Sequence, residues 1–148
     1  MAESLLSNVL IPVASEEDAA TTMRAVLPRL DPEDAKGTLL FVVEKAGGAL
    51  DKASVEQQES YATDVFEAAA DVVTDANRSA AFDSEVAYGS DVAQAIIDAA
   101  HEIDATAIVF TPRHRSRWRE LLTGDVARDL IEESDVPVIT LPEAETDE

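Results

Sequence analysis

Short apolar runs alternate with segments of helical periodicity, and this alternation constrains the fold more than any other feature of the sequence. The apolar runs cover residues 8–13, 38–43, 82–88, 107–110 and 136–141. Between them, apolar residues recur at helical spacing in residues 15–30, 54–73, 92–103 and 122–130. Strands that alternate with helices require right-handed crossovers, which build a parallel sheet covered by helices on both faces. The pattern therefore predicts an α/β domain with a five-stranded parallel sheet.

Turn and capping residues mark where several of these segments begin. Ser15 with Asp18 predicts a capped helix start, Ser54 with Gln57 predicts a second, and residues 89–91 (Gly-Ser-Asp) predict a turn and cap before the third helix. The runs at 8–13 and 38–43 are continuously apolar, which is typical of strands buried on both faces, whereas residues 82–88 alternate and predict a more exposed strand.

The composition indicates one domain in the cytoplasm. Its 148 residues are 46% hydrophobic, enough for a core, and no apolar run approaches the roughly 18–20 residues of a membrane span. The acidic start lacks the positive charge of a secretory signal, and the absence of cysteine excludes disulfides and thiol chemistry. We expect residues 1–148 to form a single domain with an ordered core at about 7–142 and a frayed acidic tail at 143–148.

The net charge of −20 arises from 31 acidic residues against 11 basic ones, of which three are lysine. A compact state with this charge repels itself in dilute buffer. Concentrated salt relieves the repulsion, because the Debye length falls to about 3 Å near 1 M. We therefore predict a halophilic protein with an acidic surface; the alternative is an ordinary mesophilic acidic protein.

The densest positive charge lies between the fourth strand and the fourth helix, where four of the 11 basic residues fall within seven positions. This segment holds four arginines, a histidine and a tryptophan: Arg113, His114, Arg115, Arg117, Trp118 and Arg119. With the common strand order 3-2-1-4-5, the ligand crevice of a doubly wound sheet joins the ends of strands one and four. That crevice combines residues 12–14 with the arginine segment and the start of the next helix, whose N–H groups favour anions.

The chain as a whole resembles the universal stress protein family. The resemblance is carried by a first strand ending in Pro-Val, a long second helix, the turn at 89–91, the segment Leu-Leu-Thr-Gly-Asp-Val-Ala at 121–127 and the closing run Val-Pro-Val-Ile-Thr-Leu at 136–141. It implies a Rossmann-like sandwich of the adenine nucleotide alpha hydrolase type that is commonly dimeric. One branch of the family binds ATP through a G-x2-G-x9-G-[S/T] motif, and another branch lacks both the motif and the binding.

This chain departs from the ATP motif at most of its positions. Counted back from Gly124, the motif's earlier glycines fall on His114 and Thr111, and its closing Ser or Thr falls on Asp125. The acidic residue that follows the first strand in the family falls on Ala14. Side chains at the glycine positions block backbone N–H groups from a phosphate, and a carboxylate at Asp125 repels it. We expect no ATP binding in the family manner and no cofactor.

The arginines and the crevice leave an alternative open. We favour arginines that pair with carboxylates such as Glu120, Asp125 and Asp129 or that dock across a dimer, because high salt weakens charge-driven anion binding. In the alternative, the crevice binds an adenine nucleotide (ATP or ADP) or another phosphorylated anion, since guanidinium groups match phosphate. Its residues would be Pro12, Val13, Ala14, Val42, Thr111, Arg113, His114, Arg115, Gly124, Asp125 and Val126. Arg113, His114 and Arg115 would contact phosphate, while Pro12, Val13 and Val42 would bracket the base.

Other site chemistries find little support. His101 is expected to interact with the end of the third helix, and His114 lacks the nucleophile and base that a nucleotide hydrolase, the second alternative, would need. No metal-ligand spacing occurs, and a short basic segment in an acidic chain makes nucleic-acid binding a poor fit.

The last apolar run predicts how copies of the chain associate. Residues 136–141 carry no charge and contain Pro137 as the sole edge-blunting residue, so their edge is prone to pair with another strand. We predict a homodimer through Val136, Val138, Ile139, Thr140 and Leu141. The sequence thus predicts a non-enzymatic, dimeric, cytoplasmic protein of the universal stress type with a regulatory or protective role and an unidentified protein partner.

Overall fold

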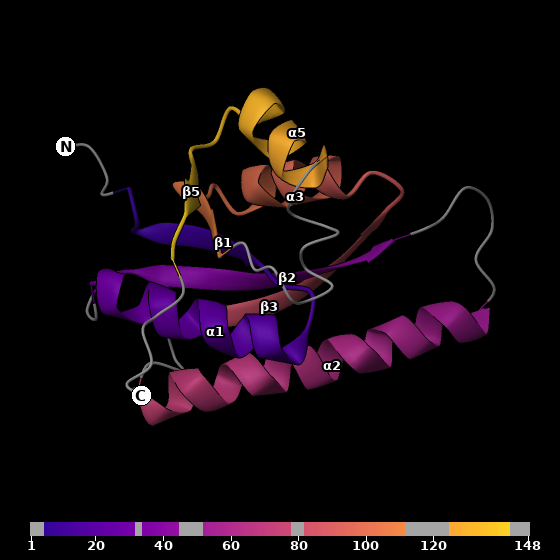
Figure 1. The fold of residues 1–148 in the computed structure, drawn as a ribbon, viewed down its shortest axis with the longest axis horizontal. Coiled ribbons are helices and arrows are strands. Elements are labelled where there is room, and N and C mark those ends of the chain that lie inside the picture. Colours follow the sequence, from indigo (N-terminus) through magenta and orange to yellow (C-terminus); the bar gives the residue numbers. More distant parts are fainter. Residues whose placement is uncertain (1–4, 32–33, 45–51, 78–81, 112–124, 143–148) are drawn as a thin grey trace.

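A five-stranded parallel sheet in the order β3-β2-β1-β4-β5 forms the centre of the structure (Figure 1). This computed structural model describes residues 5–31, 34–44, 52–77, 82–111 and 125–142. In chain order, its strands are β1 (Asn8–Pro12), β2 (Lys36–Glu44), β3 (Phe82–Gly89), β4 (Ala107–Phe110) and β5 (Val138–Thr140). Its α-helices are α1 (Glu16–Val26), α2 (Lys52–Asp75), α3 (Val92–Glu102) and α5 (Asp125–Glu133). The predicted fold class and strand order are confirmed.

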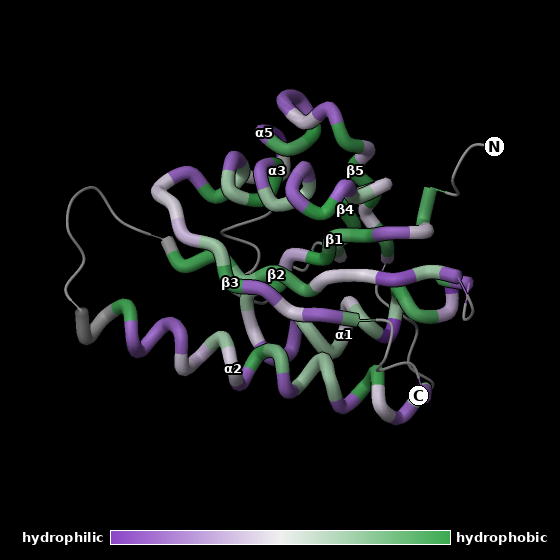
Figure 2. Tube along the Cα trace, turned by 180° about the vertical axis from the view of Figure 1, so that it is seen from behind, coloured by the Kyte–Doolittle hydropathy of each residue, from purple (hydrophilic) through white to green (hydrophobic). Residues whose placement is uncertain are grey.

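Helices cover both faces of the sheet, and each layer encloses its own hydrophobic cluster. Helices α1 and α2 lie on one face, and α3 and α5 lie on the other (Figure 1). Val9 and Ile11 belong to the cluster under α1 and α2, whereas Leu10 belongs to the cluster under α3 and α5. All three side chains are fully buried, so β1 is enclosed on both faces, as its continuous apolar run predicts. Figure 2 shows these apolar strands between helices whose outer faces are polar.

The caps of α1 and α3 agree with the sequence, whereas the end of α1 and the predicted start of α2 at Ser54 do not. Ser15 caps α1 by accepting the N–H of Asp18 at 3.1 Å, and Asp91 caps α3 by accepting the N–H of Gln94 at 3.2 Å. The predicted first helix ran to residue 30, whereas α1 ends at Val26 and a 3₁₀ turn follows (Leu27–Arg29). Pro28 causes this early end, because proline lacks the N–H that would continue the helix.

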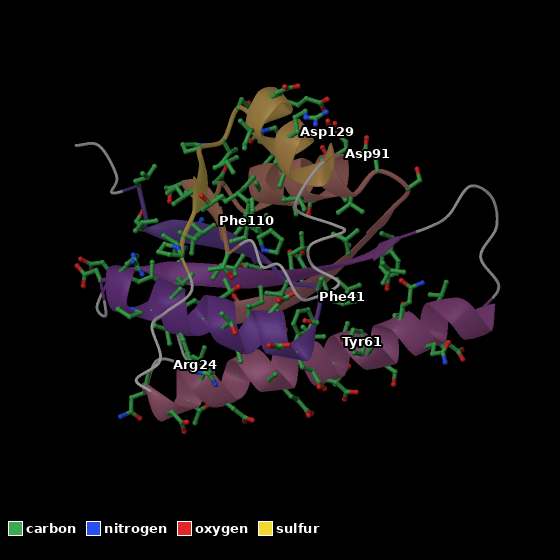
Figure 3. The ribbon with its side chains drawn as sticks, in the orientation of Figure 1. Arg24, Phe41, Tyr61, Asp91, Phe110 and Asp129 are labelled. Atoms are coloured by element: carbon green, nitrogen blue, oxygen red, sulfur yellow. The ribbon has the colours of Figure 1, made fainter. Side chains whose placement is uncertain are left out.

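The second helix begins at Lys52, two residues before the predicted Ser54, and continues for 24 residues to Asp75. Its buried side chains are Ala62, Val65, Ala69 and Val73. Tyr61 meets Phe41 of β2 edge to face, with ring centroids 6.0 Å apart and planes at 75° (Figure 3). The part of α2 that follows this aromatic pair therefore provides the apolar side chains that cover the sheet. None of the described helices has the length and apolarity to span a membrane.

The two edges of the sheet differ in length and packing. β5 has three residues, shorter than the predicted 136–141, although Ile108 N–H bonds the Pro137 carbonyl at 2.8 Å and Leu141 N–H bonds the Phe110 carbonyl at 2.9 Å. β3 has eight residues, of which four are exposed and none is fully buried, in line with the prediction of a more exposed strand. Phe82 packs over Gly37 of β2, where an added Cβ would lie 2.8 Å from its ring, so this close approach of the strands requires glycine.

Candidate functional site

The strand order reverses between β1 and β4, and the candidate site lies at the carboxyl ends of these two strands. β1 pairs with β2 on one side and with β4 on the other, in parallel. The chain leaves β1 through Val13 and Ala14 and leaves β4 through Thr111. In doubly wound sheets this position forms the ligand crevice. Of the predicted crevice residues, Pro12, Val13, Ala14 and Thr111 lie at these two strand ends, whereas Val42 lies within β2.

Pro12, the last residue of β1, and the two residues that follow it are buried. Val13 and Ala14 are 3% and 6% exposed. Val13 donates its N–H to the Leu40 carbonyl at 2.9 Å, so its backbone is held to β2. Its side chain belongs to the cluster under α1 and α2, whereas Ala14 and the half-buried Val42 belong to the cluster under α3 and α5. The side chains of Val13 and Val42 thus lie on opposite faces of the sheet. They do not lie together against one face of a nucleotide base, as the predicted crevice would need.

Thr111 directly follows the end of β4, and its side chain is hydrogen-bonded to α1. Its hydroxyl lies 2.6 Å from the hydroxyl of Thr22, and both residues are fully buried. A buried hydroxyl that is already hydrogen-bonded costs free energy to separate from its partner. The motif's first glycine position is therefore occupied by a fully buried threonine whose hydroxyl is bonded to α1.

Sequence reasoning missed a buried carboxyl group beside this pair. Asp18 is fully buried on α1, one helical turn before Thr22. The position of Asp18 in the sequence is a signal of this burial. Asp18 and Thr22 share a helix face with Met23 and Val26, and this face of α1 packs on the sheet. The sequence pattern predicts Asp18 only as part of the capped helix start. Its carboxyl group is a second buried polar side chain on the α1 face that carries Thr22.

Several predicted crevice residues lie outside the described residues, namely Arg113, His114, Arg115 and Gly124, together with the rest of the arginine segment. Asp125 and Val126 form the first turn of α5 in the described backbone. Their place in α5 agrees with the predicted helix start. The roles assigned to these six residues remain predictions.

The predicted association edge lies at the far side of β4. β4 and β5 pair in parallel from Ile108↔Val138 to Phe110↔Thr140. Val138 and Ile139 are half-buried, each packed against a different core cluster, while Thr140 is exposed. Val136 and Leu141 flank the strand rather than belong to it. Beside them, Ile131 of α5 is 63% exposed and borders a shallow hollow with Val136, Pro137 and Val138.

His101 lies in the last turn of α3, as predicted, and is joined to the segment that precedes β5. Its Nε2 lies 2.6 Å from Oδ1 of Asp135. This hydrogen bond is the main cause that lowers the pKa of Asp135 below its ordinary 3.8. Both side chains are more than half exposed, so the contact connects surface elements and not a catalytic cavity.

The described residues offer few groups for covalent chemistry. They contain no cluster of three or more metal-ligating histidine or acidic side chains. The polar side chains described near the end of β4 are the mutually bonded hydroxyls of Thr111 and Thr22, with the buried Asp18 one helical turn before Thr22 on α1.

Comparisons with known proteins agree with this architecture. The sequence profile of the universal stress protein family matches residues 6–142. A family member from Burkholderia pseudomallei superposes with a TM-score of 0.71 at 23% identity, over 95% of this chain and 99% of its own. The Archaeoglobus fulgidus universal stress protein in complex with dAMP gives 0.63 at 18% identity, over 93% and 99%. A universal stress protein in complex with cAMP gives 0.52 at 16% identity, over 95% and 100%.

No curated protein sequence matches significantly. The structural likenesses, all at low identity, show the shared fold. The profile match covers nearly the whole chain, from the residues before β1 to the end of β5. This protein therefore belongs to the universal stress protein family.

Proposed function

We propose that this chain is a non-enzymatic regulatory or protective member of its family, that it acts as a homodimer in a salt-rich cytoplasm, and that it does not bind ATP in the family manner. The observation that supports this proposal most strongly concerns the end of β4. There Thr111 is fully buried, and its hydroxyl lies 2.6 Å from that of Thr22. A glycine there would let a backbone N–H approach phosphate, whereas a threonine side chain fills part of that space.

Two further groups under the crevice support the same proposal. Ala14 offers a methyl group where the family resemblance expects an acidic residue, so it provides no oxygen to accept a hydrogen bond from a ribose hydroxyl. Asp18 is fully buried one helical turn before Thr22, and its carboxyl group is not one that favours a nearby phosphate anion. Each of these groups lowers the affinity expected for a nucleoside triphosphate.

The β5 edge supports the homodimer. Val138, Ile139 and Thr140 carry no charge, and the exposed Ile131 extends the apolar surface from the strand onto α5. Two copies that pair through this edge face each other without opposed carboxylates from the strand itself. An isologous interface of this kind buries apolar surface from both copies.

A nucleotide or phosphate site remains the second candidate, because two structurally similar proteins were solved with dAMP and with cAMP. In this chain the contacts would come from Arg113 and Arg115, whose guanidinium groups would supply the charge that the missing glycine contacts no longer provide. A hydrolase that uses His114 as an acid is less consistent with the described residues, which offer no activated nucleophile.

The test is thermal unfolding in molar KCl with and without millimolar ATP, ADP, dAMP or cAMP, each with Mg²⁺. A ligand at about 100 times its Kd would stabilise the fold by about 2.7 kcal/mol. The proposal expects no shift beyond that of an equal concentration of inorganic phosphate, and a dimer by sedimentation. A nucleotide-specific shift that disappears in Arg113→Ala/Arg115→Ala would establish the second candidate instead, and a monomer would contradict the dimer.

A further inference from the structure

The β3 edge of the sheet is open over a longer strand than the β5 edge. β3 is the outermost strand next to β2, with which it pairs from Gly37↔Phe82 to Glu44↔Gly89. Within the described chain no strand pairs with its outer side, and Figure 2 shows it between α2 and α3. Half of its backbone N–H and C=O groups point away from β2, and such a row is a template for an added strand.

The side chains of β3 alternate between two helix layers. Phe82 and Val86 pack in the cluster under α1 and α2, and the Tyr88 hydroxyl bonds Glu59 of α2. Ala87 packs in the cluster under α3 and α5. A strand added beside β3 would follow the same alternation, so its successive side chains would enter the α2 side and the α3 side in turn.

On the α2 side, β3 borders an open hollow of about 570 Å³. Its lining is largely apolar, with Glu67 and Asp83 as the acidic members: Leu39, Thr63, Phe66, Glu67, Ala70, Val73, Phe82, Asp83 and Ser84. Phe66 and Phe82 are half-buried, so parts of their rings still face solvent. This hollow can accept large apolar side chains at little cost, because covering its walls removes apolar surface from water.

On the α3 side, β3 borders a smaller hollow of about 280 Å³ with a different lining. Its lining includes three acidic residues, Glu85, Asp98 and Glu102, beside apolar ones such as Leu40, Ala95 and Ala99. All three acidic side chains are exposed. They favour lysine or arginine, whose aliphatic stems can cover the apolar residues while their charged ends meet the carboxylates.

We propose that the β3 edge binds an extended segment of a partner protein as an additional strand. The segment alternates large apolar side chains, which enter the α2 hollow, with lysine or arginine side chains, which meet the carboxylates on α3. Backbone hydrogen bonds along β3 provide affinity, and the two unlike hollows select the alternating pattern.

The charge of the β3 edge selects a basic partner over a second copy of this chain. Two copies paired through β3 would bring Asp83 and Glu85 of one copy near the same carboxylates of the other, and like charges opposite each other are destabilising. The chain's own C-terminal residues 143–148 include four acidic side chains and meet the same repulsion. A basic segment gains from the same carboxylates.

The probe is a fluorescent synthetic peptide of alternating leucine and lysine, titrated into the full chain and monitored by anisotropy. Two control peptides test the pattern: one has the same composition with its leucines and lysines in separate blocks, and the other has alanine in place of leucine. We expect both controls to bind at least about tenfold more weakly than the alternating peptide. Amide hydrogen exchange should slow in β3, and not in β5, when the alternating peptide binds.

A charge-reversal pair locates the contact on the protein. Asp98→Lys/Glu102→Lys changes the α3 hollow, and Asp64→Lys/Asp71→Lys makes the same change of charge at exposed positions of α2 outside both hollows. We expect the first variant to weaken binding by at least about tenfold and the second to change it by less than about threefold. Equal losses in both variants, equal binding of the alternating and block peptides, or no slowing of exchange in β3 would each overturn the proposal.

The inference deepens the proposed function by naming a partner surface, and it rests on that function for the expectation that a protein partner exists. The two can fail separately. A nucleotide-specific thermal shift would contradict the proposed function while leaving peptide binding at β3 intact. Failure of the peptide experiment would leave the results for the crevice and for the dimer unchanged.

Discussion

The two edges of the sheet have the same kind of open backbone but different side chains. β5 is short and uncharged and lies beside the exposed Ile131, whereas β3 is long, carries Asp83 and Glu85, and lies between two unlike hollows. An uncharged edge suits an identical strand, because no charge opposes itself across a two-fold axis. An acidic edge rejects its own copy and suits a basic partner. The comparison teaches that side chains, more than backbone groups, decide what an open edge can pair with.

The largest effect is expected from removing the apolar anchor of β3. Phe82→Ala should lower the free energy of unfolding by about 2–3 kcal/mol, because a half-buried aromatic ring that packs over Gly37 is lost. Urea denaturation in molar KCl measures the change, with Ser84→Ala as the exposed control on the same strand. If β3 lies outside the dimer interface, the loss of unfolding free energy is the same at low and high protein concentration. A loss that changes with protein concentration would mean that β3, like β5, takes part in self-association.

A smaller effect is expected from placing a charge on β5. In a two-fold dimer, Thr140→Asp brings two carboxylates close together, so we expect association to weaken at least about tenfold, or 1.4 kcal/mol. Sedimentation velocity across a range of protein concentrations measures this change. Ser84→Asp is the matched substitution at an exposed position of β3. Equal dissociation by both variants would mean that the acidic edge also takes part in self-association.

The hydrogen bond between His101 and Asp135, next to β5, should respond to acid. This bond lowers the pKa of Asp135 below 3.8, so its contribution to stability is present above 3.8 and is lost as the pH falls through the lowered pKa. The stability difference between the wild type and Asp135→Asn should therefore shrink below pH 3.8. Urea denaturation as a function of pH tests this expectation, with Glu132→Gln as the neighbouring control. A difference that stays constant through this range would contradict it.

The smallest effect is expected at the hydrogen bond between Tyr88 of β3 and Glu59, and its dependence on pH is opposite to that of the Asp135 contact. The hydrogen bond to Glu59 raises the pKa of Tyr88 above 10.0, so its contribution is present below 10.0 and is lost as the pH rises through the raised pKa. In Glu59→Gln, Tyr88 should ionise at lower pH, as measured by phenolate absorbance. Tyr88→Phe isolates the signal, since Tyr61 is the other tyrosine of the chain. An unchanged titration in Glu59→Gln would exclude this contact in solution.

Much of the fold could be predicted from local patterns because those patterns reflect burial. Residues 9–13 are apolar since β1 is enclosed on both faces, and the alternation at 82–88 reflects the exposure of an edge strand. The caps at Ser15 and Asp91 were predicted from local hydrogen-bonding chemistry. The early end of α1 could not be predicted from the apolar spacing alone, because that spacing continues past Pro28 to Leu30.

The candidate site was less predictable because its polar contacts join residues distant in sequence. The hydroxyls of Thr22 and Thr111 meet across 89 positions of the chain, and no local pattern marks such a pair. Asp18 was predicted as a cap, and its burial follows from the packing of α1 over the end of β1. The two hollows beside β3 likewise depend on how α2 and α3 are placed relative to one strand.

The central position of β1 has a consequence for synthesis on the ribosome. β1 is made before the other four strands, yet it pairs on one side with β4, whose first residue, Ala107, is added almost a hundred residues later. At about 5–20 residues per second, one flank of this largely apolar strand waits roughly 5–20 s for its neighbour. Throughout that time Val9, Leu10 and Ile11 belong to a sheet that is only partly assembled. β1 is therefore the segment that a molecular chaperone would most need to shield from aggregation.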